Sequence, residues 1–173
     1  MSSYDCAGDY PAHDVARYKG ARWPDWRTPP ELFAALHREF GFTVDAAASD
    51  ANALLPRYWT AETDGLAQSW AGEVVWCNPP YGAETKKWTR KAREEAAKGA
   101  TAVLLIPAST DTAWWHDDVM QAAEVRFIRG LLSFIRPDGS RGHGGVQGSA
   151  VVIFLPGHQG PPRFSSMNRP RGA

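Results

Sequence analysis

Apolar residues recur along the chain at two spacings, one typical of helices and one typical of strands. From Leu32 to Phe40 an apolar residue returns at every fourth position, which predicts a helix that Gly41 is expected to end. The preceding segment, Thr28–Glu31, has the composition of a helix start. It offers a threonine for the N-cap, a proline for the first helical position and a glutamate that completes a capping box.

Short β-rich runs predict strands that are buried on both faces. The two clearest are residues 73–77, cut off by Asn-Pro-Pro, and residues 101–106, ended by Pro107. Further strands are expected at residues 42–45, 57–60, 125–128 and 149–155, and helices at about 84–98 and 109–123. Because helices alternate with strands that carry few polar residues, the pattern predicts an α/β fold with a mainly parallel sheet flanked by helices.

The two ends of the chain lack this pattern. Residues 1–22 are polar and irregular, and we expect them to form a flexible N-terminal arm. Residues 157–173 are rich in Gly, Pro, Arg and Ser, which predicts a disordered basic tail. One folded domain is therefore expected at residues 23–156, with an exposed, mobile loop at 136–148.

Composition narrows the class of protein. The chain has 173 residues, of which 43% are hydrophobic and 22% charged, as in ordinary soluble domains. Its 19 basic and 19 acidic residues cancel, although arginines gather after Phe127. The two cysteines give neither metal-ligand spacing nor a disulfide framework, so we expect no metal and a reducing cytoplasm. No signal peptide and no run near ~20 apolar residues is present, so no membrane partner is expected.

The tetrapeptide Asn78-Pro79-Pro80-Tyr81 follows directly after the strand predicted at 73–77. Sheets of the predicted class bind ligands at the carboxyl ends of their strands. A string of this kind arises by chance in a chain of this length about once in a thousand. An ordinary turn is the alternative, since Asn-Pro begins turns, but a turn has no need of the aromatic residue.

These four residues suit chemistry at the amino group of an aromatic base, whose lone pair is delocalised into the ring. The Asn78 side-chain carbonyl and the Pro79 backbone carbonyl can each accept a hydrogen bond from one N–H of the amino group, and these two bonds localise its lone pair on the nitrogen. The proline pair fixes both acceptors in advance, and Tyr81 can stack on the base against a methyl donor. Because a paired base cannot present its amino group in this way, the substrate must be flipped out or single-stranded.

Several motifs, in a fixed order along the chain, resemble those of a known family. The motifs are T-P-P-E-L-F, D-A-A-A, D-G-L-x-x-x-W, V-W-C-N-P-P-Y-G and A-V-L-L-I-P-A-x-T-D-T-x-W-W, spread over residues 23–155. Together they resemble the phage-encoded, Dam-like DNA N6-adenine methyltransferases. The resemblance implies a Rossmann-like methyltransferase fold, S-adenosylmethionine as cofactor and methyl transfer to adenine N6 in DNA.

The resemblance also assigns roles to residues of this chain. The catalytic residues would be Asn78, Pro79, Pro80 and Tyr81. The cofactor-binding residues would be Thr28, Pro29, Asp45, Ala46, Ala47, Asp64, Gly65, Leu66 and Asn78. Three features depart from the usual pattern. The loop after Asp45 contains no glycine, no clear acid is placed to hold the ribose (Glu62 is a weak candidate), and Arg129 precedes Gly130 where relatives often read G-R-L.

Two other functional hypotheses remain open. The same tetrapeptide occurs in enzymes that methylate RNA bases or a protein glutamine amide, and a methyltransferase-like module can bind nucleic acid without turnover.

If DNA is the substrate, no separate recognition domain fits into this length, so loops or a homodimer must supply the contacts. The candidates are Lys86 and Lys87 after the tetrapeptide, and Arg136 and Arg141 in the glycine-rich loop. An ordinary solvated helix face explains the two lysines better than a DNA contact does.

Overall fold

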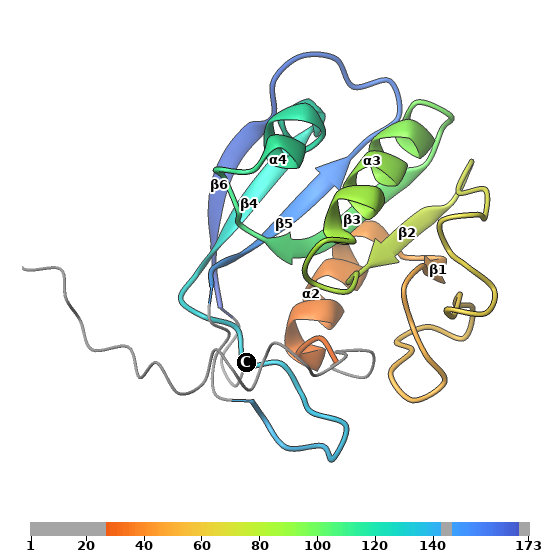
Figure 1. The fold of residues 1–173 in the computed structure, drawn as a ribbon, viewed down its shortest axis with the longest axis vertical. Helices are drawn as coiled ribbons and strands as arrows, with labels where there is room; N and C mark the ends of the chain where they lie inside the picture. The colour runs from red at the N-terminus through yellow and green to blue at the C-terminus, as the bar shows by residue number, and fades with distance from the viewer. Residues whose placement is uncertain (1–26, 143–146, 170–173) are drawn as a thin grey trace, which may run out of the picture.

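The computed structural model describes residues 27–142 and 147–169 (Figure 1). Its strands form one sheet in the order β1-β2-β3-β5-β4-β6. The strands are β1 (Val44–Asp45), β2 (Val74–Cys77), β3 (Thr101–Pro107), β4 (Glu124–Arg129), β5 (Ser149–Phe154) and β6 (Arg163–Asn168). The helices are α2 (Pro30–Phe40), α3 (Thr85–Ala96), α4 (Ala113–Asp117) and the 3-10 helix η1 (Val119–Gln121). The arm predicted at 1–22 lies outside the described residues.

The sheet is mixed, which corrects the prediction of a mainly parallel sheet. β1, β2 and β3 pair in parallel, and β6 pairs in parallel with β4. β5, however, runs antiparallel between β3 and β4. The connection from β4 to β5 has no helix among its described residues, so β5 returns beside β4 without the crossover that a parallel neighbour requires. The α/β class itself is confirmed.

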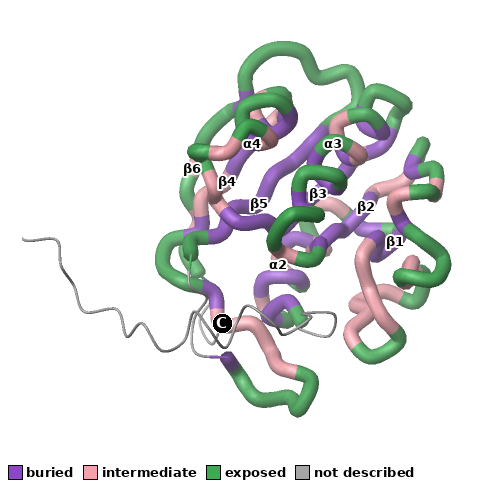
Figure 2. Tube along the Cα trace, viewed as in Figure 1, coloured by how far each residue is buried: buried purple, intermediate pink, exposed green. Residues whose placement is uncertain are grey.

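Helices cover both faces of the sheet, so the described part of the chain has three layers (Figures 1 and 2). On one face, Leu32 and Leu36 of α2 pack with Trp76 and Val103 from the sheet. On the other face, α3 and α4 pack against the alternate strand residues, among them Val75, Cys77, Leu104, Ile106 and Val152. All six residues of β5 are buried, as are the last six of β3. A strand covered in this way carries few polar residues whether its neighbour is parallel or antiparallel.

The ends of α2 test the capping prediction. Gly41 ends the helix as expected, with a left-handed φ of 67° and its N–H bonded to the His37 carbonyl at 2.8 Å. The start was predicted wrongly, because Pro29 is the N-cap and Thr28 makes no capping hydrogen bond. The Thr28 side chain is instead buried.

The strand predicted at 57–60 is reduced to an isolated bridge between Tyr58 and Asp45, and two other elements also differ from the sequence-based expectation. The helix predicted at 109–123 is divided into α4 and η1, and the break at Asp118 places its buried carboxylate 2.9 Å from Arg93 Nε. The disordered tail predicted at 157–173 is wrong for residues 163–168, which form β6. Contacts with β4 hold this edge strand, since Phe164 stacks on Phe127 with ring centroids 6.0 Å apart and Arg163 pairs with Glu124 at 3.0 Å.

Candidate active site

One edge of the sheet gathers the segments that follow β1 and β2. Because β1, β2 and β3 are parallel, their carboxyl ends lie on the same side, seen at the lower side of Figure 1. Ala46 follows β1 there and Asn78 follows β2. β5 runs the other way, and its first residue, Ser149, pairs with Pro107 at this edge. The fold thus brings the predicted catalytic loop and the first predicted cofactor segment to one edge.

The tetrapeptide loop is fixed at its far end by Thr85, the first residue of α3. The buried Thr85 hydroxyl donates to the Pro80 carbonyl at 3.3 Å and accepts the Gly82 N–H at 3.2 Å. Pro79 is buried, Pro80 is exposed and Asn78 is half-buried. Within the described residues, neither the Asn78 side chain nor the Pro79 carbonyl makes a hydrogen bond. The two predicted acceptors therefore have no partner in the described parts of the chain, and the next carbonyl of the loop, that of Pro80, is held by Thr85.

The Tyr81 side chain packs against Phe134, and its hydroxyl group is buried. Its ring meets Phe134 edge-on, with ring centroids 5.7 Å apart and planes at 85°. The hydroxyl is buried without a hydrogen-bond partner among the described residues, and the Ser149 side chain lies near it outside good hydrogen-bond geometry. Burial raises the pKa of Tyr81, so the phenol stays neutral. The half-buried ring is thereby placed to present part of its surface to a ligand.

The segments around Ala46 and Gly65 interlock, although they lie far apart in the sequence. A side chain at position 65 would collide with the Ala46 carbonyl oxygen and would also crowd the Trp88 ring. The Gly65 carbonyl in turn accepts the Trp70 indole N–H at 2.9 Å. Two predicted cofactor segments, 45–47 and 64–66, are therefore in direct contact, and glycine is the residue that permits it.

Asp45 directs its carboxylate into its own loop. The side chain is buried and accepts the backbone N–H of Leu54 at 3.2 Å and that of Ala47. Burial raises the pKa of Asp45 to about 6, because the charged form loses its hydration. The neighbouring Cys77 thiol is also buried, and burial together with Asp45 raises its pKa. Asp45 thus organises the loop from Ala46 to Leu54, and a direct contact with a cofactor stays a prediction.

Asp64, which the resemblance assigns to the cofactor site, lies in a turn. It is exposed and adopts a left-handed φ of 50°, and its Oδ1 accepts the Leu66 N–H at 3.0 Å. The turn presents Gly65 to Ala46 and leaves Leu66 half-buried against the core. Glu62, the weak ribose candidate, is exposed.

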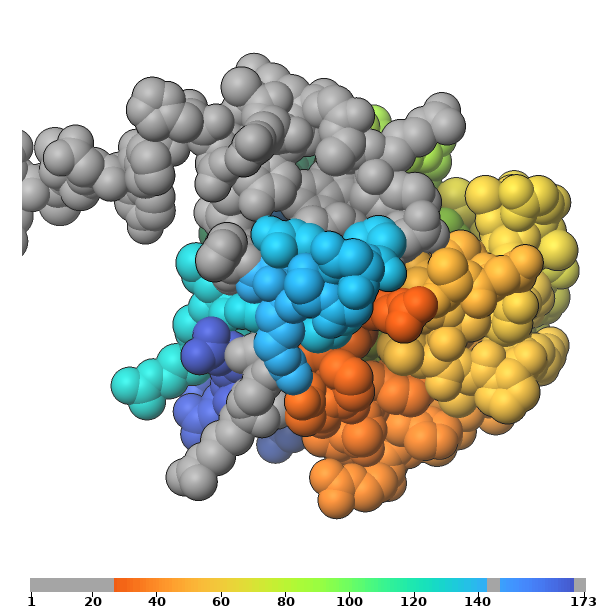
Figure 3. Space-filling view, turned by 90° about the horizontal axis from the view of Figure 1, so that it is seen from below, coloured from red at the N-terminus to blue at the C-terminus, as the bar shows by residue number. Residues whose placement is uncertain are grey.

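A hairpin at residues 134–142 connects the start of α2 with the catalytic loop. Arg27 and Ile135 exchange two backbone hydrogen bonds, at 2.8 and 3.0 Å, and Ile135 also forms a bridge with Arg141. Phe134 of the same hairpin contacts Tyr81. Figure 3 looks onto this side, where the light-blue hairpin lies beside the orange-red start of α2. Thr28 and Pro29 are both buried here, and the Thr28 hydroxyl has no hydrogen-bond partner in the described parts of the chain.

The four predicted DNA contacts fall in two places. Lys86 and Lys87 are exposed on α3, and Lys87 pairs with Glu84 at 2.7 Å. Arg136 and Arg141 belong to the hairpin, where Arg141 pairs with Glu31 at 2.8 Å. Sequence reasoning missed Thr85 and Phe134 altogether. The only local signal for Thr85 was a threonine at the start of the helix after the tetrapeptide, and Phe134 had none.

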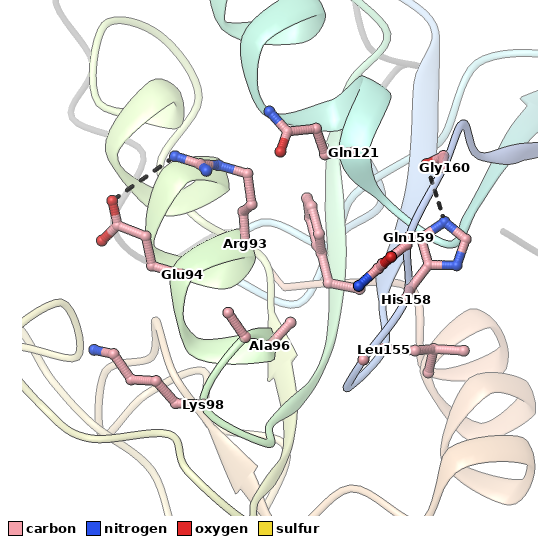
Figure 4. Close-up of a pocket in the computed structure, with 12 residues that line it drawn as sticks. Arg93, Glu94, Ala96, Lys98, Gln121, Leu155, His158, Gln159 and Gly160 are labelled. Carbon is pink, nitrogen blue, oxygen red and sulfur yellow. Dashed lines mark hydrogen bonds and ion pairs between the residues drawn. The ribbon is translucent and has the colours of Figure 1, made fainter.

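A cavity of about 780 Å³ lies away from this edge. It forms where α3 and β5 end, and Figure 4 shows Arg93, Lys98, Gln121 and His158 around it. Because β5 is antiparallel to β3, its carboxyl end is at the opposite edge from the tetrapeptide. The cavity is therefore separate from the candidate active site.

The described residues contain neither a membrane-spanning helix nor a metal-binding cluster. None of the helices there has the length and apolar character needed to cross a membrane. No three side chains of the metal-binding types cluster in 27–142 or 147–169.

Comparison with known proteins identifies the family. A family model described as DNA N-6-adenine-methyltransferase (Dam) matches residues 18–171. The chain is 35% identical over 124 residues to a DNA N-6-adenine-methyltransferase of Escherichia phage T1, a match that covers 68% of this chain and 52% of the relative. It is 28% identical over 105 residues to a DNA N-6-adenine-methyltransferase of Haemophilus phage HP1, a match that covers 60% of this chain and 61% of the relative. The chain thus spans about half to three fifths of these relatives. Since the family model matches most of its length, the chain belongs to the Dam family of DNA N-6-adenine-methyltransferases.

Proposed function

We propose that this chain transfers a methyl group from S-adenosylmethionine to the N6 amino group of adenine in DNA, on a Rossmann-like methyltransferase fold. The observation that carries the proposal is the pair of acceptors at Asn78 and Pro79, which bond no described residue and lie on a loop fixed by Thr85. Family membership and the activity named for both phage relatives support DNA adenine as the acceptor.

The residues at this edge fit the cofactor. Thr28 contributes a buried hydroxyl that lacks a partner among the described residues, as a ligand-binding group would. The contact between Gly65 and Ala46 leaves backbone, and no bulky side chain, between two of the predicted cofactor segments. Thr28-Pro29, Asp45–Ala47, Asp64–Leu66 and Asn78 would hold the molecule. When bound, it supplies an electrophilic methyl group on a positively charged sulfur.

Asn78 and Pro79 would act on the amino group of the base. Each accepts one N–H through a carbonyl oxygen, which draws the nitrogen toward tetrahedral geometry and localises its lone pair. In that geometry the amino nitrogen would present its lone pair to the methyl group that the cofactor supplies, and one amino proton would pass to solvent. In-line transfer of this kind depends mainly on alignment, and the prolines and Thr85 supply it by holding the acceptors in place.

Tyr81 would fix the plane of the base. Phe134 and the buried hydroxyl end hold its ring, so a base stacked on the ring keeps its amino group near the two acceptors. The adenine must be flipped out of the duplex or single-stranded to reach this position. Lys86, Lys87, Arg136 and Arg141 remain the proposed contacts to DNA, and the host cytoplasm is the proposed compartment.

One labelling experiment tests the proposal against its alternatives. The purified chain is incubated with labelled S-adenosylmethionine and, separately, unmethylated DNA, RNA and a glutamine-containing protein. The nucleic acids are then digested to nucleosides. Labelled N6-methyladenine from DNA supports the proposal. Label found on RNA or protein alone would favour another methyl acceptor, and cofactor binding without transfer would indicate a non-catalytic binding module.

A further inference from the structure

A second cavity, of about 430 Å³, lies along the exposed side of α3. One wall comes from the 64–66 turn through Leu66, and the rest comes from five residues of α3: Lys86, Lys87, Arg90, Lys91 and Glu94. Four cationic side chains therefore face this cavity against one carboxylate. Such a balance favours an anionic ligand.

Two of the four cations form no ion pair within residues 27–142 and 147–169. Lys87 pairs with Glu84 at 2.7 Å, and Lys91 pairs with Glu95 at 2.9 Å. Lys86 and Arg90 are exposed and form no ion pair with a described residue. They are four residues apart on one helix, so they lie on the same side and are offset by about 6 Å along its axis. The positive charge available to a ligand is concentrated in this pair.

The cavity borders both parts of the candidate active site. α3 begins at Thr85, whose hydroxyl bonds the Pro80 carbonyl, and Lys86 is the next residue. On the other side, Leu66 follows Gly65, which packs on Ala46. An anion bound at Lys86 would therefore lie at the start of α3, where the loop that carries the catalytic tetrapeptide joins the helix.

The hairpin arginines are engaged in holding their own loop. Arg141 pairs with Glu31 at 2.8 Å, which attaches the hairpin to the start of α2. Arg136 Nη1 lies 3.4 Å from the Ser140 hydroxyl within the hairpin. A DNA strand would have to displace these partners, whereas Lys86 and Arg90 can bind a phosphate without breaking an ion pair.

We infer that the α3 cavity, through Lys86 and Arg90, binds the phosphate backbone of DNA next to the target base. The inference rests on the proposed function, because it takes DNA as the substrate. Phosphate contacts of this kind are independent of sequence and fix the position of the strand. They would hold the chain of the flipped nucleotide while Asn78, Pro79 and Tyr81 engage its base.

The test measures DNA affinity as a function of salt. The double variant K86Q/R90Q is compared with the control R38Q/K98Q, which removes the same charge from residues that do not line this cavity. Fluorescence anisotropy with a short unmethylated duplex gives the binding constant between about 50 and 200 mM salt. For K86Q/R90Q we expect the slope of log K against log salt to become shallower by about 2. The control should keep the slope of the unmodified chain.

Cofactor affinity and methylation separate the possible outcomes. Calorimetry of K86Q/R90Q with S-adenosylmethionine should give unchanged affinity. Lost cofactor affinity with an unchanged DNA slope would assign the cavity to the cofactor carboxylate and overturn the inference. If the slope falls as expected but the unmodified chain forms no N6-methyladenine, the proposed function fails while the phosphate site stands. Unchanged slope together with normal methylation refutes the phosphate site alone.

Discussion

The loops after β1 and β2 lie at the same edge of the sheet but use their polar groups in opposite ways. In the first loop, Asp45 bonds the backbone of Leu54 and Ala47, and Gly65 closes over Ala46. In the second, Thr85 fixes the Pro80 carbonyl while the Asn78 side chain and the Pro79 carbonyl bond nothing in the described chain. A loop that satisfies its own polar groups serves as a scaffold, whereas unsatisfied groups on a fixed loop are available to a ligand.

Substitutions in the two loops should therefore have different consequences. At the two acceptors of the second loop they should change turnover and leave stability nearly intact, because these groups bond nothing among the described residues. In the first loop they should change stability and cofactor affinity together, because the same groups shape the loop and its surface. Four variants test this contrast.

Asn78→Ala should have the largest effect. Removing one preorganised polar contact from a transition state lowers turnover by ~10²-fold or more. Because the Asn78 side chain bonds no described residue, the melting temperature and the affinity for S-adenosylmethionine should change little. Single-turnover methylation of DNA and calorimetry with the cofactor measure the two quantities. Normal turnover in this variant would remove the basis of the proposed mechanism, and a large loss of stability would contradict the contrast between the loops.

Gly65→Ala should disturb the first loop. The added methyl group collides with the Ala46 carbonyl oxygen, so the 45–47 and 64–66 segments must separate. Overpacking of this kind destabilises a protein by about 1–3 kcal/mol, and we expect S-adenosylmethionine affinity to fall by ~10-fold with it. Gly148→Ala is the control, since neither Gly65 nor Gly148 has a left-handed φ and no atom lies near the methyl group added at position 148. Equal effects of the two substitutions on cofactor affinity would show that the contact with Ala46 is unimportant.

Asp45→Asn should change how stability depends on pH. The usual pKa of an aspartate, 3.8, is raised to about 6 in the folded state, so the folded chain keeps its proton where the unfolded chain has lost it. Stability therefore falls as the pH rises from about 4 to about 6, by about 2 kcal/mol. Asparagine cannot ionise but can still accept the Leu54 N–H. The variant should lack this loss, which urea unfolding at pH 4 and pH 8 measures. An identical pH dependence in both proteins would mean that the Asp45 carboxyl titrates normally.

Some features of the fold and of the candidate site could be predicted from the local sequence. The place of the tetrapeptide after a buried strand followed from local composition, because Val74–Cys77 is β-rich and Asn-Pro-Pro must end it. Gly41 was identifiable as a helix end for the same local reason. The resemblance assigned Gly65 to the cofactor site, but the contact that requires a glycine there comes from Ala46, a residue far away in the sequence.

The errors in the fold have the same origin. β5 reads as a parallel strand because helices bury both of its faces, and only its neighbours reveal its direction. β6 reads as disordered because its own residues are polar, and its order depends on Phe127 and Glu124 in β4. Phe134 escaped notice because nothing around it in the sequence shows that its ring meets Tyr81. Each error concerns a residue or strand whose partner is distant along the chain.

Tyr81→Phe should have the smallest effect and makes the contrast sharper. The Tyr81 hydroxyl is buried without a partner in the described residues, and an unsatisfied group of this kind costs about 1–3 kcal/mol. Phenylalanine removes that cost and keeps the ring against Phe134, so stability should rise by about 1 kcal/mol. Turnover should stay within about threefold, because stacking needs only the ring face.

Tyr81→Leu is the control, because it retains an apolar side chain but has no aromatic face. Its turnover should fall by ~10-fold, from loss of a stacking contact of about 1–3 kcal/mol. If the phenylalanine variant lost as much turnover as the leucine variant, the hydroxyl itself would take part in the reaction. The second loop would then use one more polar group than the two free acceptors.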